Sequence, residues 1–195
     1  MTPCFGAAQA VRAPAPPGAE AERRVHVVQG EFHVTGDPGV VLTTILGSCV
    51  AACLRDPLAR VGGMNHFLLP GRGEEAGGDS VRYGVHAMEL LVNGLLREGA
   101  RRERLEAKLF GGARMLEGLT DIGTQNAEFA KHFLQRERIA FTGGSLQGDR
   151  GRRVQFWPAS GRARQMTIEQ GEATVFAAER RAKAAPVDVG SVELF

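Results

Sequence analysis

Apolar residues in the first third of the chain fall into short runs that are typical of β-strands. Residues 25–35 are rich in β-branched side chains and partly alternate, which predicts a strand. Residues 40–46 predict a strand that is buried on both faces, and residues 50–54 predict another strand, although so short a run also fits the start of a helix. Residues 60–70 continue the pattern, with a Gly-Gly pair that suggests a bulge or a close backbone approach.

Two later segments have the spacing of helices. Ser80 can cap a helix N-terminus, and apolar residues behind it recur every three or four positions until Gly99. A second helix is expected over residues 124–136, with its apolar side chains facing inward. Short apolar runs predict the remaining strands, at residues 104–110, 139–144, 153–157 and 163–168.

These elements define the expected fold class. About eight short strands and two helices are expected, and the helices do not alternate regularly with the strands. This order argues against a doubly wound parallel sheet and favours an α+β fold, a layered sandwich of mixed or antiparallel sheet with flanking helices in a single domain. We expect the domain to span residues 25–171, after a disordered leader at residues 1–24 and before a C-terminal extension, helix or tail, at residues 172–195.

Composition and charge narrow the functional classes. The chain has 195 residues, of which 43% are apolar, and a net charge of +2, which gives no support for nucleic-acid binding. No apolar run approaches the roughly 20 residues of a membrane span, and the N-terminus lacks the pattern of a secretory signal. We therefore expect no membrane insertion. Because there are only three cysteines, one of them in the expected leader, we expect free thiols and a cytoplasmic location.

The candidate chemistry centres on Cys49, in the segment LGSCVAACL. A cysteine attacks as a thiolate and needs a neighbouring base, usually a histidine. His66 follows 17 residues later in the next expected strand, and two strands joined by a short turn would lie side by side. Thr43 and Thr44, in the preceding strand, could fix the tautomer of this imidazole. The pattern therefore predicts a cysteine nucleophile with a histidine base.

The surroundings of Cys49 also allow other interpretations. Gly47 and Ser48 permit a sharp turn that could aim backbone N–H groups at an oxyanion. Free cysteines, however, are usually packed in the core, and Cys53, which lacks this turn, is expected to be a core residue. A zinc site built from both cysteines and His66 would lack a fourth ligand, so we expect no metal and no cofactor.

The longer sequence around these residues resembles one family. The segments LGSCVAACLRDPLARVGGMNHFLLP, RYGVHAMELLVNGLLREGA, LEAKLFGGARML and GDRGRRVQFWPASGR are similar, in this order, to the CheD family of chemoreceptor glutamine deamidases. The resemblance extends from about Val25 to Ile168. In that family the cysteine of the GSC motif is the nucleophile and the histidine of the MNH motif is its partner. A threonine six residues before the cysteine completes the triad, so the resemblance implies Cys49, His66 and Thr43 as catalytic residues.

The resemblance also implies a reaction and its partners. The expected activity is hydrolysis of specific glutamine side chains of methyl-accepting chemotaxis receptors to glutamate, through a thioester on the cysteine. Some members of the family also bind a CheC-type phosphatase that regulates them. Two other classes stay open: a non-catalytic binding module in which the cysteine only packs, and a related thiol hydrolase, transglutaminase or esterase that acts on glutamyl methyl esters.

Two further segments could border the site. The Gly pair in residues 110–113 follows an expected strand, so this pair either lines the site or makes a tight turn. The basic cluster at residues 148–153 is expected to be a solvated face, or else a rim that meets acidic residues of a receptor helix.

Overall fold

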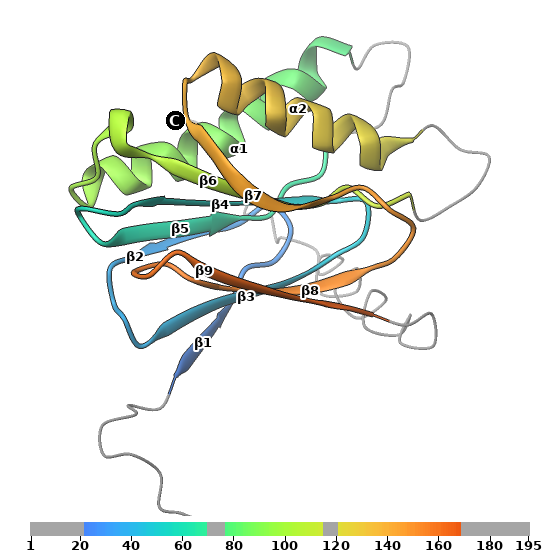
Figure 1. Ribbon diagram of the computed structural model, residues 1–195. Helices are drawn as coiled ribbons and strands as arrows, with labels where there is room; N and C mark the ends of the chain where they lie inside the picture. Colours follow the sequence, from blue (N-terminus) through green and yellow to red (C-terminus); the bar gives the residue numbers. More distant parts are fainter. Residues whose placement is uncertain (1–21, 70–76, 115–120, 169–195) are drawn as a thin grey trace, which may run out of the picture.

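The structure is a computed structural model that describes residues 22–69, 77–114 and 121–168 of the chain. It has three layers, in which two β-sheets lie face to face and two helices cover the outer face of one sheet (Figure 1). This arrangement confirms the expected α+β sandwich with flanking helices. Nearly all of the expected leader and the whole C-terminal extension lie outside the described residues.

The first sheet has four strands in the order β1-β3-β8-β9. Its strands are β1 (Arg23–His26), β3 (Val40–Leu46), β8 (Arg152–Trp157) and β9 (Arg162–Thr167). β3 pairs with β1 in parallel and with β8 in antiparallel orientation, so the sheet is mixed. β3 is buried along its whole length, which confirms the expected strand buried on both faces.

The second sheet has five strands in the order β2-β5-β4-β6-β7 and lies between the first sheet and the helices (Figure 1). Its strands are β2 (Phe32–Thr35), β5 (Val61–Asn65), β4 (Val50–Asp56), β6 (Glu106–Gly111) and β7 (Ala140–Leu146). The central strand β4 pairs in antiparallel orientation with β5 and β6, whereas β6 and β7 run parallel. This sheet is therefore mixed as well.

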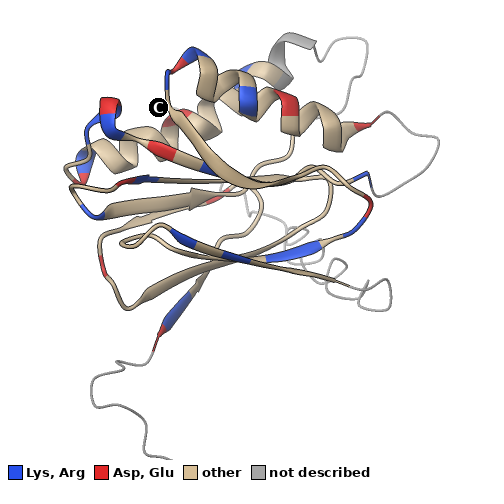
Figure 2. Ribbon diagram, viewed as in Figure 1, with Lys and Arg blue, Asp and Glu red and all other residues tan. Residues whose placement is uncertain are grey.

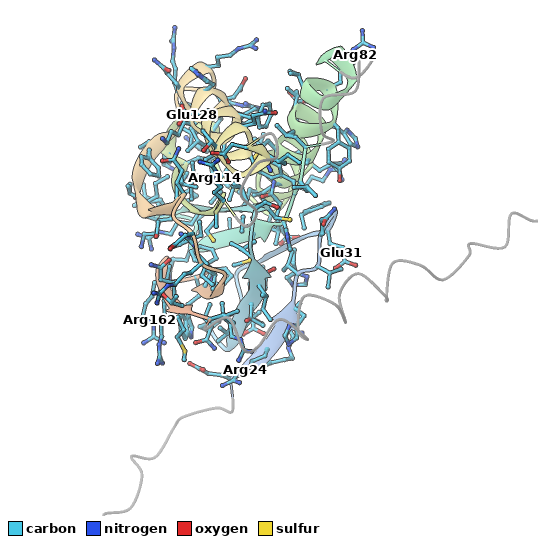
Figure 3. The ribbon with its side chains drawn as sticks, turned by 90° about the vertical axis from the view of Figure 1, so that its right-hand side faces the viewer. Arg24, Glu31, Arg82, Arg114, Glu128 and Arg162 are labelled. Atoms are coloured by element: carbon cyan, nitrogen blue, oxygen red, sulfur yellow. The ribbon has the colours of Figure 1, made fainter. Side chains whose placement is uncertain are left out.

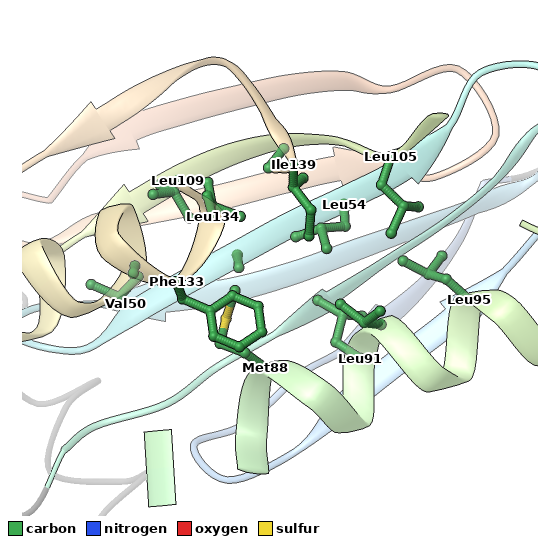
Figure 4. Close-up of a cluster of buried hydrophobic side chains, with 14 of the residues drawn as sticks. Val50, Leu54, Met88, Leu91, Leu95, Leu105, Leu109, Phe133, Leu134 and Ile139 are labelled. Atoms are coloured by element: carbon green, nitrogen blue, oxygen red, sulfur yellow. The ribbon is translucent and has the colours of Figure 1, made fainter. Parts of the chain in front are cut away.

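The helices are α1 (Gly77–Arg97) and α2 (Ile122–Arg136), with a short 3-10 helix η1 (Arg102–Arg104) before β6. Apolar side chains of both helices pack on the five-stranded sheet, as Figure 4 shows for Met88, Leu91 and Phe133. Within the described ranges, no helix combines the length and the apolar character needed to cross a lipid bilayer.

Strand β4 contributes to two hydrophobic cores. Val50, Ala52 and Leu54 point toward the helices, whereas Ala51 and Cys53 point toward the four-stranded sheet. This division follows from the alternation of side chains along a strand. All five side chains are buried. Because β4 packs against both the helices and the four-stranded sheet, it fixes the position of Cys49, the residue just before it.

Residues 25–35 differ from the single expected strand. They form the end of β1 and the whole of β2, which belong to different sheets. The chain turns between them at residues 27–31, where Gly30 has a φ of 91° that a side chain would disfavour. β-branched composition favours strands but does not say to which sheet they belong, which explains the error. A second difference is that α1 begins at Gly77, three residues before the expected cap at Ser80.

The basic cluster of the sequence separates into two environments. Figure 2 shows basic residues along β8 and β9, and Arg153, Arg162 and Arg164 are exposed there. Arg152 is buried instead, and its guanidinium donates to the carbonyl oxygens of Ser145 (2.7 Å) and Gln147. Burial lowers the pKa of Arg152. The expected solvated face therefore excludes Arg152, which joins β8 to the end of β7.

Candidate active site

Strands β4 and β5 bring Cys49 and His66 to one face of the sheet. Beyond the end of β5, Val50 pairs with Phe67 through two backbone hydrogen bonds of 3.0 and 2.9 Å. Continuing the register in which Cys53 lies opposite Met64 places His66 opposite Ala51. Cys49 is two residues from Ala51 and shares its face, so Cys49 and His66 are diagonal neighbours. Diagonal neighbours on adjacent strands are close enough for a large side chain such as the imidazole of His66 to reach across.

Thr44 holds the imidazole of His66. Its hydroxyl donates to the carbonyl oxygen of Val27 at 2.7 Å, and its Oγ1 lies 2.9 Å from Nδ1 of His66. The Val27 oxygen is also 3.3 Å from Nδ1. A hydroxyl has one hydrogen, which Thr44 gives to Val27, so both oxygens act as acceptors toward Nδ1. The geometry assigns the proton to Nδ1 and leaves the lone pair on Nε2, the tautomer that a general base needs.

Thr43, which the resemblance selects, has a different environment. Successive side chains of a strand point to opposite faces, so Thr43 and Thr44 cannot both face His66. Thr44 lies on the face of β3 that carries Leu42 and Leu46, whose side chains fill the core between the sheets. Thr43 is also buried, with 4% of its surface exposed, but it faces away from this core. The side chain that accepts the hydrogen bond from the imidazole is that of Thr44, and the role of Thr43 stays a prediction.

Backbone hydrogen bonds hold the turn before β4 against the end of β6. Gly112 donates to the carbonyl oxygen of Cys49 at 2.7 Å, and Ala113 donates to that of Gly47 at 2.8 Å. Gly111 allows this close approach, because a Cβ atom there would lie 2.1 Å from the oxygen of Cys49 and its φ is 105°. The Gly pair predicted either to line the site or to turn therefore borders the cysteine directly.

The expected oxyanion donors lie in the same turn. The N–H of Val50 donates to Phe67 and is thereby committed to the strand pairing. The amides of Ser48 and Cys49 belong to the same expected oxyanion turn. Ser48 is partly buried, and its carbonyl oxygen accepts a hydrogen bond of 2.9 Å from Asn126 of α2. No local pattern in the sequence marks Asn126 as a neighbour of this turn.

A segment between β1 and β2 forms a wall beside the cysteine and the histidine. Gly30 donates to the carbonyl oxygen of His66 at 2.7 Å, and His66 donates its backbone N–H to Glu31 at 3.0 Å (Glu31 is labelled in Figure 3). Gln29 of this segment places Oε1 3.7 Å from Sγ of Cys49. The side-chain amide of Gln29 therefore lies at the sulfur, a neighbour that sequence reasoning did not identify.

The two described cysteines differ in environment. Cys49 is partly exposed at the edge of the core between the sheets, whereas Cys53 is 1% exposed within it. Burial raises the pKa of the Cys53 thiol far above its usual range, although nearby Lys108 opposes this shift. Cys53 is therefore a core residue, as its sequence context predicts. Among the described residues, no three Cys, His, Asp or Glu side chains come together as metal ligands.

Comparisons with known proteins find similarity to the CheD family over most of the chain. The family model described as CheD chemotactic sensory transduction matches residues 68–167. The chain is also 57% identical, over 177 residues, to the probable chemoreceptor glutamine deamidase CheD of Agrobacterium fabrum, which covers 90% of this chain and 98% of that protein. The chain belongs to the CheD family. A second CheD relative, from Acidiphilium cryptum, has the same descriptive name and is 60% identical over 178 residues, 89% of this chain and 94% of that protein.

The match to the CheD family model begins at residue 68, directly after Phe67. Cys49, His66 and Thr43 therefore precede it, and their assignment depends on the geometry above and on the resemblance of the surrounding motifs. Membership of the CheD family is shown, and the catalytic roles of these three residues stay predictions.

Proposed function

We propose that this protein hydrolyses the side-chain amides of glutamine residues in chemoreceptors, with Cys49 as nucleophile and His66 as general base. The observation that carries the proposal is the placement of the two side chains as diagonal neighbours on one face of β4 and β5, with Nδ1 of the imidazole held by Thr44. The names of the CheD relatives supply the substrate class.

The first half of the reaction forms a thioester. Nε2 of His66 takes the proton of the Cys49 thiol, and Sγ attacks the Cδ atom of the substrate glutamine. Negative charge moves to the amide oxygen, where the backbone amides of the turn before β4 stabilise it. The tetrahedral intermediate then collapses, the C–N bond breaks, and the imidazolium returns its proton to the leaving group, which departs as ammonia.

The second half of the reaction releases glutamate. Nε2 of His66 takes a proton from a water molecule, and the resulting hydroxide attacks the thioester carbon. The C–S bond breaks, and the departing thiolate takes the proton back from the imidazolium of His66. The released carboxylic acid gives its proton to ammonia, so the net reaction is amide plus water to carboxylate plus ammonium. The hydrogen bond from Nδ1 to Thr44 (2.9 Å) keeps the same nitrogen available in both halves. No cofactor is required by this balance.

The resemblance extends the proposal to partners and location. The substrates would be methyl-accepting chemotaxis receptors, and a CheC-type phosphatase would regulate the enzyme. Both partners act in the cytoplasm, where the partly exposed Cys49 would stay a free thiol. Copurification of this protein with a CheC-type phosphatase tests the regulatory partner separately from the chemistry.

Mass spectrometry of purified receptor after incubation with the protein tests the reaction. We expect a gain of about one mass unit at each converted glutamine, because an amide becomes an acid. Cys49→Ala is the matched control, and conversion by this variant would refute the cysteine mechanism. A receptor left unchanged by wild type would support the non-catalytic binding module instead.

Two related reactions give different products in the same experiment. A transglutaminase would attach an added primary amine to the glutamine, and an esterase would release methanol from glutamyl methyl esters. The amide bond of a primary carboxamide requires protonation of its leaving group, which His66 provides in the proposal. Amine incorporation in preference to hydrolysis would reassign the site to acyl transfer.

A further inference from the structure

The side chain of Asn126 connects helix α2 to both chain segments that carry the proposed catalytic residues. Its Nδ2 donates to the carbonyl oxygen of Ser48 at 2.9 Å, and its Oδ1 accepts from the backbone N–H of Leu69 at 2.8 Å. Ser48 directly precedes Cys49, and Leu69 is three residues after His66. The side chain of Asn126 is completely buried.

The partners fix the orientation of this amide. A carbonyl oxygen can only accept and a backbone N–H can only donate, so Nδ2 must face Ser48 and Oδ1 must face Leu69. Rotating the amide by half a turn would place Oδ1 against the carbonyl oxygen of Ser48 and Nδ2 against the N–H of Leu69, so neither hydrogen bond could form. Asn126 therefore recognises the two segments as a pair and holds them at a fixed separation.

The contact with Ser48 has a consequence for Cys49. The carbonyl of Ser48 and the N–H of Cys49 belong to one planar trans peptide group, so they point in opposite directions. Fixing the carbonyl toward α2 fixes the N–H of Cys49 toward the other side of the turn. That N–H belongs to the turn expected to supply oxyanion donors, and it is the amide of the proposed nucleophile itself.

We propose that Asn126 is a positioning residue that aims the backbone N–H of Cys49 at the developing oxyanion. This inference rests on the proposed function, because it assigns a task within the same amide hydrolysis. Asn126 acts through the peptide group and does not touch the substrate. Its second hydrogen bond, to Leu69, holds the segment after His66 in the matching position.

Asn126→Asp separates the two contacts of the side chain. The introduced side chain has nearly the same shape and, when ionised, can still accept from Leu69 but cannot donate to Ser48. Because burial favours the protonated form, which could donate, the variant is assayed over a range of pH and compared where the carboxylate is ionised. We expect kcat for glutamine deamidation to fall about 100-fold, the lower end of the loss seen when one oxyanion donor is removed. KM should stay within about threefold of wild type, because the loss appears only in the transition state.

Alkylation by iodoacetamide separates positioning of the oxyanion donor from a general loosening of the site. This displacement requires the thiolate but develops no oxyanion. We expect the alkylation rate of Cys49 in Asn126→Asp to stay within about threefold of wild type while deamidation falls. If alkylation and deamidation fall in parallel, the inference is overturned.

Leu134→Ala is the matched control for stability. Leu134 lies on the same helix, is 2% exposed and packs in the core between α2 and the sheet. Its truncation should lower the melting temperature without touching Ser48 or Leu69. Equal losses of kcat in the two variants, measured below both melting temperatures, would show that Asn126 only stabilises the fold.

Nuclear magnetic resonance provides a readout that does not depend on activity. The amide nitrogen of Cys49 should change its chemical shift in Asn126→Asp but not in Leu134→Ala, because only the former loses a hydrogen bond to the same peptide group. An unchanged shift would overturn the inference.

Asn126→Ser, which is too short to reach both partners, serves as a second variant if Asn126→Asp does not fold. Failure of wild type to form glutamate would instead refute the proposed function.

Discussion

The two ends of β4 show two different uses of a polar group at the end of a buried strand. Cys49 precedes the strand, is partly exposed and has Gln29 Oε1 at 3.7 Å. Asp56 ends it, is completely buried and accepts five hydrogen bonds, three from backbone N–H groups and two from the guanidinium of Arg104. The first end leaves its sulfur partly exposed, whereas hydrogen bonds from within the chain saturate the second.

The pKa of Asp56 shows what this saturation does. Burial by itself would raise this pKa, but the hydrogen bonds from Arg104, Arg101, Ala59 and Leu58 outweigh burial and hold it well below the usual range. The carboxylate therefore stays charged at neutral pH. A reactive group needs the opposite arrangement, in which exposure and a nearby base allow the proton to leave and return. The comparison separates a structural end of β4, at Asp56, from the end at Cys49 for which we propose chemistry.

The largest effect is expected from exchanging the thiol at the reactive end. Cys49→Ala should abolish conversion of receptor glutamine to glutamate while leaving the melting temperature close to that of wild type, because a partly exposed sulfur contributes little packing. Cys53→Ala is the control, and we expect it to retain deamidation within about threefold while losing stability. Receptor mass spectrometry and thermal unfolding measure the two properties. Activity lost in Cys53→Ala but kept in Cys49→Ala would reverse the assignment.

At the other end, Asp56→Ala should mainly change stability. Removal of the carboxylate leaves Arg104 and three backbone N–H groups without their acceptor, and breaking a buried ion pair costs about 3–5 kcal/mol. Urea unfolding measures this loss. Deamidation per folded molecule should stay near that of wild type, and a large fall in kcat at low temperature would contradict the division between the two ends.

A smaller effect is expected from the threonines beside the histidine. Thr44→Val removes an acceptor from Nδ1 of His66, but the Val27 oxygen at 3.3 Å remains, so we expect kcat to fall about tenfold, or about 1.4 kcal/mol of barrier. Thr43→Val should change kcat less, because its side chain faces away from the imidazole. A pH–rate profile tests the cause, since the acid limb of kcat/KM should shift only in Thr44→Val. The reverse ranking would support the assignment that the family resemblance implies.

The smallest effect concerns the acid stability of the structural end. The folded-state pKa of Asp56 is lower than its unfolded value of about 3.9, so the folded protein binds fewer protons and stability falls as the pH decreases below about 5. Asp56→Asn cannot titrate, so its unfolding free energy should depend less steeply on pH in this range. Urea titrations between about pH 3 and pH 7 measure the slopes. Equal slopes would show that other carboxylates cause the acid sensitivity.

Local patterns in the sequence predict most of the strands and the proximity of Cys49 and His66. The apolar runs at residues 40–46 and 50–54 became β3 and β4, and the short turn before β5 makes β4 and β5 neighbours. The choice between Thr43 and Thr44 was also open to prediction, because strand alternation allows only one of them to face the imidazole. The family resemblance selects Thr43, whereas the hydrogen bond to the imidazole in the structure involves Thr44.

Long-range contacts explain what local patterns could not predict. The strand pattern of residues 25–35 does not reveal that β1 and β2 belong to different sheets, which only their pairing with β3 and β5 decides. Asn126 is 78 residues from Ser48, and its local context is that of an ordinary residue near a helix start. Its contact depends on how α2 docks on the sheet. Gln29 reaches Cys49 for a similar reason, because the turn between the sheets brings it there.

The position of Asn126 in the chain has a consequence for biosynthesis. The hairpin of β4 and β5 closes only a short loop, so it can form soon after residue 67 is made, whereas α2 follows more than 50 residues later. A nascent chain would therefore carry the thiol and the imidazole long before the oxyanion site takes shape. By the proposal above, full hydrolytic competence would arise only once α2 docks on the sheet, which would delay attack on other amides during translation.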